Sequence, residues 1–171
     1  FGNYYAAWRE LDNLYQEGKT RAIGVSNFEP DRLIDLIEFN KVTPSVNQIE
    51  THLRCQRTAE HEWLEKYHVQ PMAYAPLGQG RKNEMFENPI LVEIAEAHGK
   101  TAAQVALRFL MQSGVVVIPK SVHEERIKEN FALFDFKLNT EEIEQLMKMD
   151  MATPMIGTPE NPAMVEAAMK W

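Results

Sequence analysis

The stretch VVVIPKSVHEERIKEN, residues 115–130, decides how the rest of the chain is interpreted. It opens with four consecutive β-branched residues, Val115 to Ile118, which predict a short strand that is buried on both faces. Pro119 cannot extend the hydrogen-bonded ladder, so the strand should end there. A strand of this kind belongs to a parallel sheet covered by helices, which makes the chain an α/β protein.

The second part of the stretch predicts a helix with unusual charges at its start. Ser121 and Glu124 have the spacing of a capping box, so the helix should begin at Val122, with its positive dipole end facing the strand end. Lys120 precedes that turn and Arg126 lies just inside it, and these cations would repel the dipole unless an anion joined them. A phosphate group fits. An ordinary capped helix, with its dipole neutralised by the glutamates of its first turn, is the alternative.

Composition excludes several classes of protein. The 171 residues suffice for one domain with a core, and the 44% apolar and 25% charged content is ordinary for a globular protein. A net charge of -7 without any basic run argues against binding to nucleic acid or to an anionic membrane. The single cysteine, Cys55, excludes an internal disulfide framework and favours a reducing, cytoplasmic location. The opening at Phe1, without an initiator Met, suggests a fragment or a processed chain.

Hydrophobic periodicity and turn residues predict helices that alternate with strands. The predicted strands are 20–25, 46–49, 69–74 and 115–118. The predicted helices are 4–17, one starting at Pro30, 58–67, 89–97, 102–112, one starting at Val122, and 140–149. Residues 78–83 are interpreted as a loop and the tail from Met151 as irregular. Such alternation indicates βαβ units and a parallel sheet.

Polar residues follow the carboxyl ends of all four predicted strands, where α/β proteins bind their ligands. These residues are Ser26, Asn27, Gln48, Tyr74, Lys120 and Ser121. Four parallel strands form either a small open sheet or half of an eight-stranded barrel. In both arrangements the pattern predicts a binding site at this edge of the sheet.

Several short motifs occur together and in order. They are G-V-S-N-F at 24–28, V-N-Q-I-E at 46–50, A-Y-A-P-L at 73–77, I-P-K-S at 118–121, and then Arg126, Glu129 and Asn130. Together they resemble the carboxyl-terminal half of an aldo-keto reductase, most closely prokaryotic members similar to 2,5-diketo-D-gluconate reductases. The resemblance implies a (β/α)₈ TIM barrel, of which this chain supplies about the last four βα units. It implies a single domain over 1–171, with the barrel part at 1–150 and a tail at 151–171.

The resemblance also implies an extended NADPH or NADP⁺ cofactor and a role for each matching residue. Ser26, Asn27 and Gln48 would hydrogen-bond the nicotinamide carboxamide, which needs both donors and acceptors. Tyr74 would stack on the nicotinamide ring. The remaining matches are Ala75, Pro76 and Leu77, with the loop to Arg81, for the pyrophosphate, Lys120, Ser121 and Arg126 for the 2′-phosphate, and Glu129 and Asn130 for the adenine.

The implied function is that of an oxidoreductase reducing small-molecule aldehydes or ketones to alcohols. The family's Asp, Tyr, Lys and His tetrad would precede Phe1, so we expect no catalytic residue here and no activity from this chain alone. The alternative is a catalytically silent nucleotide-binding or assembly module. Two exposed strand edges, at 20–25 and 115–118, predict a partner: the missing amino-terminal half-barrel or a second copy.

Histidine and cysteine spacing does not favour a metal site. His61 and His68 are seven residues apart, which is no known ligand spacing, and no HExxH motif occurs. His52 follows a strand end and is best interpreted as a hydrogen-bonded structural histidine. Cys55 has no base beside it in the sequence, so we expect an inert thiol.

Overall fold

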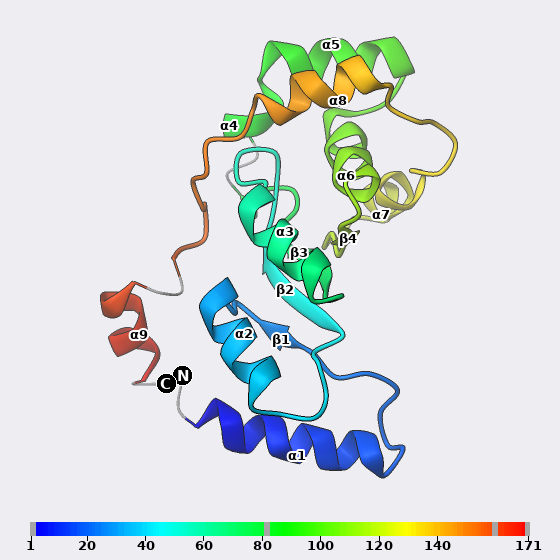
Figure 1. Ribbon diagram of the computed structural model, residues 1–171. Helices are drawn as coiled ribbons and strands as arrows, with labels where there is room; N and C mark the ends of the chain where they lie inside the picture. The colour runs from blue at the N-terminus through cyan, green and yellow to red at the C-terminus, as the bar shows by residue number, and fades with distance from the viewer. Residues whose placement is uncertain (1–2, 81–82, 159–160, 170–171) are drawn as a thin grey trace. The chain divides into compact units, whose positions relative to one another are not determined.

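The computed structural model describes residues 3–80, 83–158 and 161–169 (Figure 1). The strands in this part of the chain are β1 (Val25–Ser26), β2 (Val46–Glu50), β3 (Gln70–Tyr74) and β4 (Val116–Val117). The helices are α1 (Tyr4–Gln16), α2 (Pro30–Glu38), α3 (Thr58–Lys66), α4 (Asn83–Phe86), α5 (Pro89–His98), α6 (Ala102–Gln112), α7 (Glu124–Phe131), α8 (Thr140–Met147) and α9 (Pro162–Ala168). The predicted alternation of strands and helices is confirmed.

The four strands form one sheet in the order β1-β2-β3-β4. β1 pairs with β2 in parallel, with Ser26 opposite Gln48. β3 pairs with β4 in parallel, with Ala73 opposite Val117. Parallel neighbours in chain order require a crossover helix between them, which explains the regular spacing of the helices. The predicted parallel sheet of four strands is therefore present.

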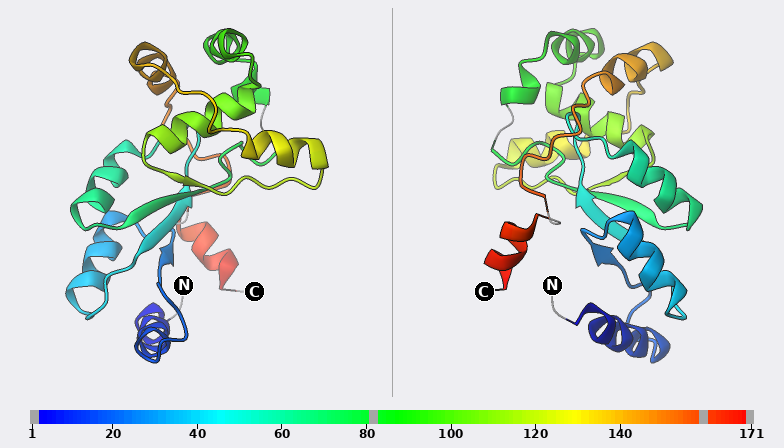
Figure 2. Two further views of the ribbon diagram at one scale, coloured as in Figure 1. Left: turned by 90° about the vertical axis from the view of Figure 1, so that its right-hand side faces the viewer. Right: turned by 60° about the vertical axis from the view of Figure 1, so that its left-hand side comes forward.

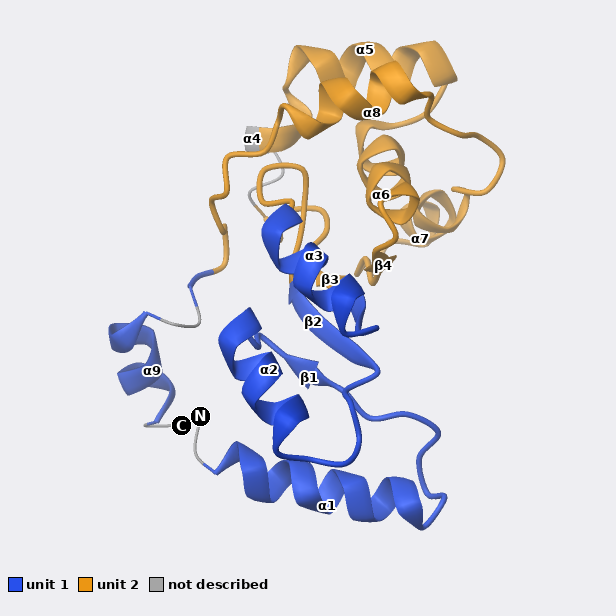
Figure 3. Cartoon of the chain, viewed as in Figure 1, with its two compact units in different colours: residues 1–49, 58–71, 157–171 blue, residues 50–57, 72–156 orange. Residues whose placement is uncertain are grey.

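The chain divides into two compact units (Figure 3). Unit 1 comprises residues 1–49, 58–71 and 157–171, and unit 2 comprises residues 50–57 and 72–156. Strands β2 and β3 contribute residues to both. The prediction that residues 1–171 form a single domain stays a prediction.

In unit 1, α2 and α3 cover one face of β1 and β2 (Figure 2). Leu33 from α2, Ile49 from β2 and Leu64 from α3 meet there in an apolar cluster. Gly24 lets the strands approach, because a β-carbon at that position would lie 2.6 Å from the backbone oxygen of Val46. The apolar cluster and the missing side chain at Gly24 together hold β1 and β2 side by side.

In unit 2, α5, α6 and α8 pack around the larger apolar core. Helix α6 begins with the predicted capping box, in which Thr101 and Gln104 each bond the other's backbone N–H. Gly99 ends α5 in the left-handed conformation, with φ of +60°. These local signals made α5 and α6 predictable from sequence.

The start of α7 differs from the prediction. The helix begins at Glu124 rather than Val122, and His123 is its N-cap without a side-chain cap hydrogen bond. The Ser121 hydroxyl instead accepts a hydrogen bond from the backbone N–H of His123, at 3.1 Å. A turn formed by Ser121 therefore replaces the capping box and moves the helix start by two residues.

The strand prediction at residues 115–118 is also wrong in part. Val115 is buried, but Val116 and Ile118 are 40% and 43% exposed. Strand β4 is last in the sheet order and has one neighbouring strand, so its side chains are less covered than those of a central strand. The first predicted strand, 20–25, is likewise reduced to Val25–Ser26.

Two short helices were missed. Residues 83–86 form α4, although 78–83 was interpreted as a loop; of that loop, residues 81–82 lie outside the described residues. Residues 162–168 form α9, although the tail was expected to be irregular. Asn161 caps α9 and Pro162 is its first residue, the same start signal as Asn88-Pro89 in α5. In the described part, no helix is long and apolar enough to cross a membrane.

Candidate functional site

The carboxyl ends of β1 and β2 bring three of the predicted residues together in unit 1. The Ser26 hydroxyl donates to the Gln48 carbonyl at 2.8 Å, and the Asn27 backbone N–H donates to the same oxygen at 3.0 Å. Buried Asn47 holds the turn, since its amide donates to the Phe28 carbonyl at 2.7 Å. The result is a cluster of hydroxyl and amide groups at a strand end.

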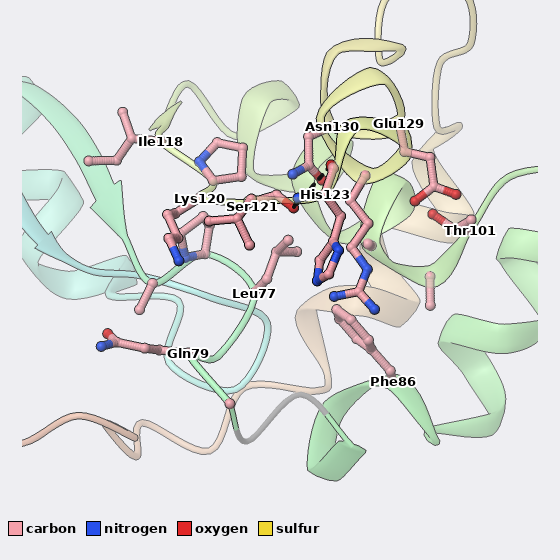
Figure 4. A pocket seen from close by; sticks show the side chains of 18 residues that line it. Leu77, Gln79, Phe86, Thr101, Ile118, Lys120, Ser121, His123, Glu129 and Asn130 are labelled. Atoms are coloured by element: carbon pink, nitrogen blue, oxygen red, sulfur yellow. Dashed lines mark hydrogen bonds between the residues drawn. The ribbon is translucent and has the colours of Figure 1, made fainter.

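Unit 2 contains a pocket with a volume of about 960 Å³ (Figure 4). The strand ends after β3 and β4, the starts of α6 and α7, and Phe86 of α4 form its walls. Its volume is at the upper end of the range typical for small-molecule and cofactor sites. Eight of the predicted cofactor residues line it: Ala75, Pro76, Leu77, Lys120, Ser121, Arg126, Glu129 and Asn130.

The charges in this pocket are predominantly positive. Lys120 and Arg126 both line it, and Glu129 is the one acidic residue among its described lining residues. Within the part of the chain that the structure describes, neither Lys120 nor Arg126 forms an ion pair. Two cations without carboxylate partners on one concave surface provide a site for an anion such as phosphate.

Local hydrogen bonds hold the wall formed by α7. The side chain of Gln104, nearly buried in α6, donates to the carbonyl groups of Glu129 and Ala132 at 3.2 and 3.1 Å. The turn at Ser121 fixes the other end of this segment, through the backbone of His123. Both ends of α7 are thus anchored by polar side chains, so its residues are positioned before any ligand binds.

Tyr74 is the ninth predicted residue of unit 2. It is the last residue of β3 and is half-buried. Its carbonyl accepts a hydrogen bond from the Thr51 backbone N–H at 3.4 Å. It is not among the residues that line the pocket. The next residue, Ala75, has φ of +49°, which turns the chain sharply after the strand. This turn directs the 75–77 segment into the pocket wall.

Three further polar or aromatic lining residues were not predicted. They are Phe86, Thr101 and His123, whereas Gln79 belongs to the loop expected over the pyrophosphate. Phe86 was missed because the segment before it was interpreted as a loop, and Thr101 because capping was taken as its whole role. His123 lies between predicted residues of the same turn, and its sequence position next to Ser121 was the available signal.

A second polar cluster in unit 2 is buried and fully satisfied. The Glu50 carboxylate accepts hydrogen bonds from the backbone N–H groups of Met155 and Ile156 and from His52 Nε2, at 3.1 Å. The Nδ1 atom of His52 accepts from the Arg54 backbone N–H at 3.2 Å, so we infer that Nε2 carries the proton. The interpretation of His52 as a structural histidine is confirmed.

The pKa of Glu50 reflects two opposed effects. Burial raises the pKa, while the hydrogen bonds from His52 and from the backbone of Met155 and Ile156 lower it. The hydrogen bonds outweigh burial, and the pKa lies below its usual value of 4.5. Glu50 is therefore held as an anion inside the protein.

The single cysteine lies in the interior of the protein. Cys55 is buried, with 2% of its surface exposed. Among the described residues, no group of three or more His, Cys, Asp or Glu side chains is arranged to hold a metal ion.

Comparison with known proteins places these features in a family. The model of the Aldo/keto reductase family matches residues 3–150. A 9,11-endoperoxide prostaglandin H2 reductase from Trypanosoma cruzi is 42% identical over 154 residues, which are 90% of this chain and 54% of that protein. A methylglyoxal reductase from Yersinia pestis is 41% identical over 158 residues, covering 92% of this chain and 57% of its own length.

A solved structure gives the same result in three dimensions. An aldo-keto reductase of the silkworm Bombyx mori, crystallised in complex with NADPH, superimposes with a TM-score of 0.82 at 33% sequence identity. The match covers 88% of this chain and 48% of that chain. This chain therefore spans about half the length of the relatives it matches.

Proposed function

This chain belongs to the Aldo/keto reductase family, and from that premise we propose that it is the cofactor-binding half of an NADPH-dependent oxidoreductase. The complete enzyme would reduce aldehydes or ketones to alcohols. The 171-residue chain would correspond to the last four βα units of a (β/α)₈ barrel, with residues 151–171 as a tail. Its partners would be a small-molecule carbonyl substrate and either an amino-terminal half-barrel or a second copy of this chain.

The observation that supports the cofactor best is the pair of cations in the pocket of unit 2. Lys120 and Arg126 line a cavity large enough for a nucleotide and have no carboxylate partner among the described residues. NADPH differs from NADH by a 2′-phosphate, which would supply the missing negative charge. The Ser121 hydroxyl lies in the same wall and adds a neutral donor.

The roles of the other residues are those implied by the family motifs that they match. Glu129 and Asn130 would hold the adenine, and residues 75–77 would lie along the pyrophosphate. Tyr74 would stack on the nicotinamide ring and fix which ring face meets the substrate. Ser26, Asn27 and Gln48 would hydrogen-bond the carboxamide, because they present both donors and acceptors. When bound, NADPH supplies the hydride that reduces the carbonyl carbon.

The test is the cofactor preference of the Arg126→Ala variant. A charged hydrogen bond to the 2′-phosphate predicts that NADPH affinity falls between about tenfold and a hundredfold, while NADH affinity is unchanged. The matched control is Lys128→Ala, which removes the same charge from α7 at a residue that pairs with Glu124 and Glu125. That variant should leave both affinities unchanged in a fluorescence titration. Equal losses for NADPH and NADH in Arg126→Ala would contradict the phosphate assignment.

The second candidate function is a catalytically silent nucleotide-binding or assembly module. It is suggested by the family motifs, because none of the residues matched to them in this chain is assigned to the family's catalytic Asp, Tyr, Lys and His tetrad. We therefore expect a chain of these 171 residues to bind NADPH but not to oxidise it in the presence of a test aldehyde, because no general acid is assigned. Absorbance at the NADPH band measures this. Steady aldehyde-dependent oxidation by the purified chain would show that it carries a proton donor of its own.

A further inference from the structure

The start of the tail is fastened to the loop after β2 by hydrogen bonds that the cofactor assignments do not use. Both segments, residues 50–57 and 151–156, belong to unit 2 (Figure 3). The Arg54 carbonyl accepts hydrogen bonds from the backbone N–H groups of Met151 and Thr153, at 3.1 and 3.3 Å. The tail therefore runs across this loop along a defined path.

A tight turn presents Arg54 to the tail. The backbone N–H of His52 donates to the Cys55 carbonyl at 3.1 Å, and the backbone N–H of Cys55 donates to the His52 carbonyl at 2.9 Å. The Arg54 backbone N–H in turn donates to His52 Nδ1 at 3.2 Å. Because these bonds fix the backbone of the turn, the Arg54 side chain leaves it from a defined point.

The Arg54 side chain donates to the sulfur of Met151. Its Nε and Nη2 atoms lie 3.3 and 3.1 Å from Met151 Sδ. A thioether is a weak acceptor, so this contact gains little for the ordering of two flexible side chains. An oxygen atom would be a much better match for a charged two-pronged donor. Met151 is also 58% exposed, so a small oxidant in solvent can reach it.

We propose that Met151 is a site of reversible oxidation to the sulfoxide, whose oxygen is held by the Arg54 guanidinium. The oxidant is hydrogen peroxide. A sulfur lone pair attacks one peroxide oxygen, the O–O bond breaks, and the other oxygen leaves as hydroxide and takes the remaining proton to become water. Sulfur is oxidised by two electrons and the peroxide is reduced.

The position of Arg54 decides what the new oxygen does to the tail. Conversion to the sulfoxide makes an apolar side chain polar, which usually disrupts the contacts of a methionine. Beside Arg54 the donors are already in place, so the sulfoxide gains a charge-assisted hydrogen bond. Oxidation of Met151 should therefore fasten the tail to the loop more firmly, whether or not a cofactor is bound.

The first measurement is the extent of oxidation at individual methionines. The chain is treated with a graded series of hydrogen peroxide and analysed by tandem mass spectrometry. The reference is Met147, the last residue of α8, which is 48% exposed and whose sulfur accepts no hydrogen bond within the described part of the chain. We expect Met151 to be converted at least as fast as Met147. A Met151 that stays reduced while Met147 is fully converted would overturn the proposal.

The second measurement is hydrogen exchange, followed by NMR, at the two amides that donate to Arg54. Exchange of the Met151 and Thr153 N–H groups requires the tail to leave the loop. The gain of about one hydrogen bond predicts about fivefold slower exchange after oxidation. The N–H of buried Val105 in α6 is the internal reference and should not change. Faster or unchanged exchange at Met151 and Thr153 would show that the sulfoxide is not held.

Three variants assign the effect to the two side chains, and the Val105 reference reports that each variant is folded. Arg54→Gln removes the charged fork but keeps the backbone carbonyl, so oxidation should no longer slow exchange. Met151→Leu should not respond to peroxide, whereas the matched control Met147→Leu should respond as wild type does. Equal slowing in wild type and Arg54→Gln would overturn the role of the guanidinium.

Reversal of the modification completes the test. Methionine sulfoxide reductases specific for the two sulfoxide epimers restore the thioether. Treatment of the oxidised chain with both should return the exchange rates of the Met151 and Thr153 amides to their original values. Slow exchange that persists after full reduction of Met151 would trace the effect to another modification and contradict the proposal.

Discussion

Two charged regions of unit 2 differ in whether the protein itself provides partners for their charges. At the carboxyl end of β2, the Glu50 carboxylate is buried and receives hydrogen bonds from His52, Met155 and Ile156. At the start of α7, Lys120 and Arg126 line an open pocket and have no ion-pair partner among the described residues. The first charge is satisfied by the protein itself and contributes to the fold. The charges of Lys120 and Arg126 are available to a bound anion.

The contrast between these two regions would not hold if Glu50 could be replaced by a neutral residue without loss of stability. Replacing it with Gln leaves donors from His52 and the backbone facing an uncharged amide, and we expect the free energy of unfolding at neutral pH to fall by about 3 kcal/mol. The control is Glu144→Gln on α8, an exposed residue, which should change stability by less than about 0.5 kcal/mol. Urea unfolding measures both.

The difference in stability between wild type and Glu50→Gln should also depend on pH. Because the pKa of folded Glu50 is lowered, its stabilising effect is present above the usual pKa of 4.5 and is lost as the pH falls through the folded pKa. Wild type and Glu50→Gln should therefore converge in stability in acid. A gap that widens below pH 4 would mean that burial, and not hydrogen bonding, dominates at this carboxylate.

A smaller effect on stability should distinguish the starts of α6 and α7, which have the same capping-box spacing in sequence. Thr101 and Gln104 form a capping box at α6, whereas Ser121 and Glu124 have the same spacing at α7 and do not. Thr101→Ala should lower the free energy of unfolding by about 1 kcal/mol. Ser121→Ala should lower it by less than about 0.5 kcal/mol and instead reduce the preference for NADPH over NADH. Similar stability losses in both variants would show that Ser121 caps its helix after all.

These two starts also show what the sequence could and could not predict. The order of elements, the parallel sheet and the capping of α6 all followed from local patterns. The same pattern failed at α7 because a serine can hydrogen-bond a turn as readily as a helix start, and the choice depends on the path of the chain after Pro119. Sequence spacing reports that a cap is possible, not that it forms.

The candidate site also contains residues that were predicted from the sequence and residues that were missed. Eight cofactor residues inferred from the family motifs do line one pocket, because each follows a strand end or lies on the segment after β4. Phe86 and His123 were missed, the first because it belongs to the short helix α4, and the second because nothing in the motif marks its ring as facing inward. The Glu50 cluster depends on contacts between residues about a hundred positions apart, which no local pattern reports.

That long separation also sets the order of events while the chain is being made. Glu50 and the backbone of Met155 that binds it are 105 residues apart. At ordinary rates of translation, roughly 5 to 20 seconds pass between the synthesis of the two. During that interval the Glu50 carboxylate lacks these two backbone donors, and of its hydrogen-bond partners in the folded chain only His52 has been made. The hydrogen bonds from the backbone of Met155 and Ile156 to Glu50 therefore cannot form until those residues have been made.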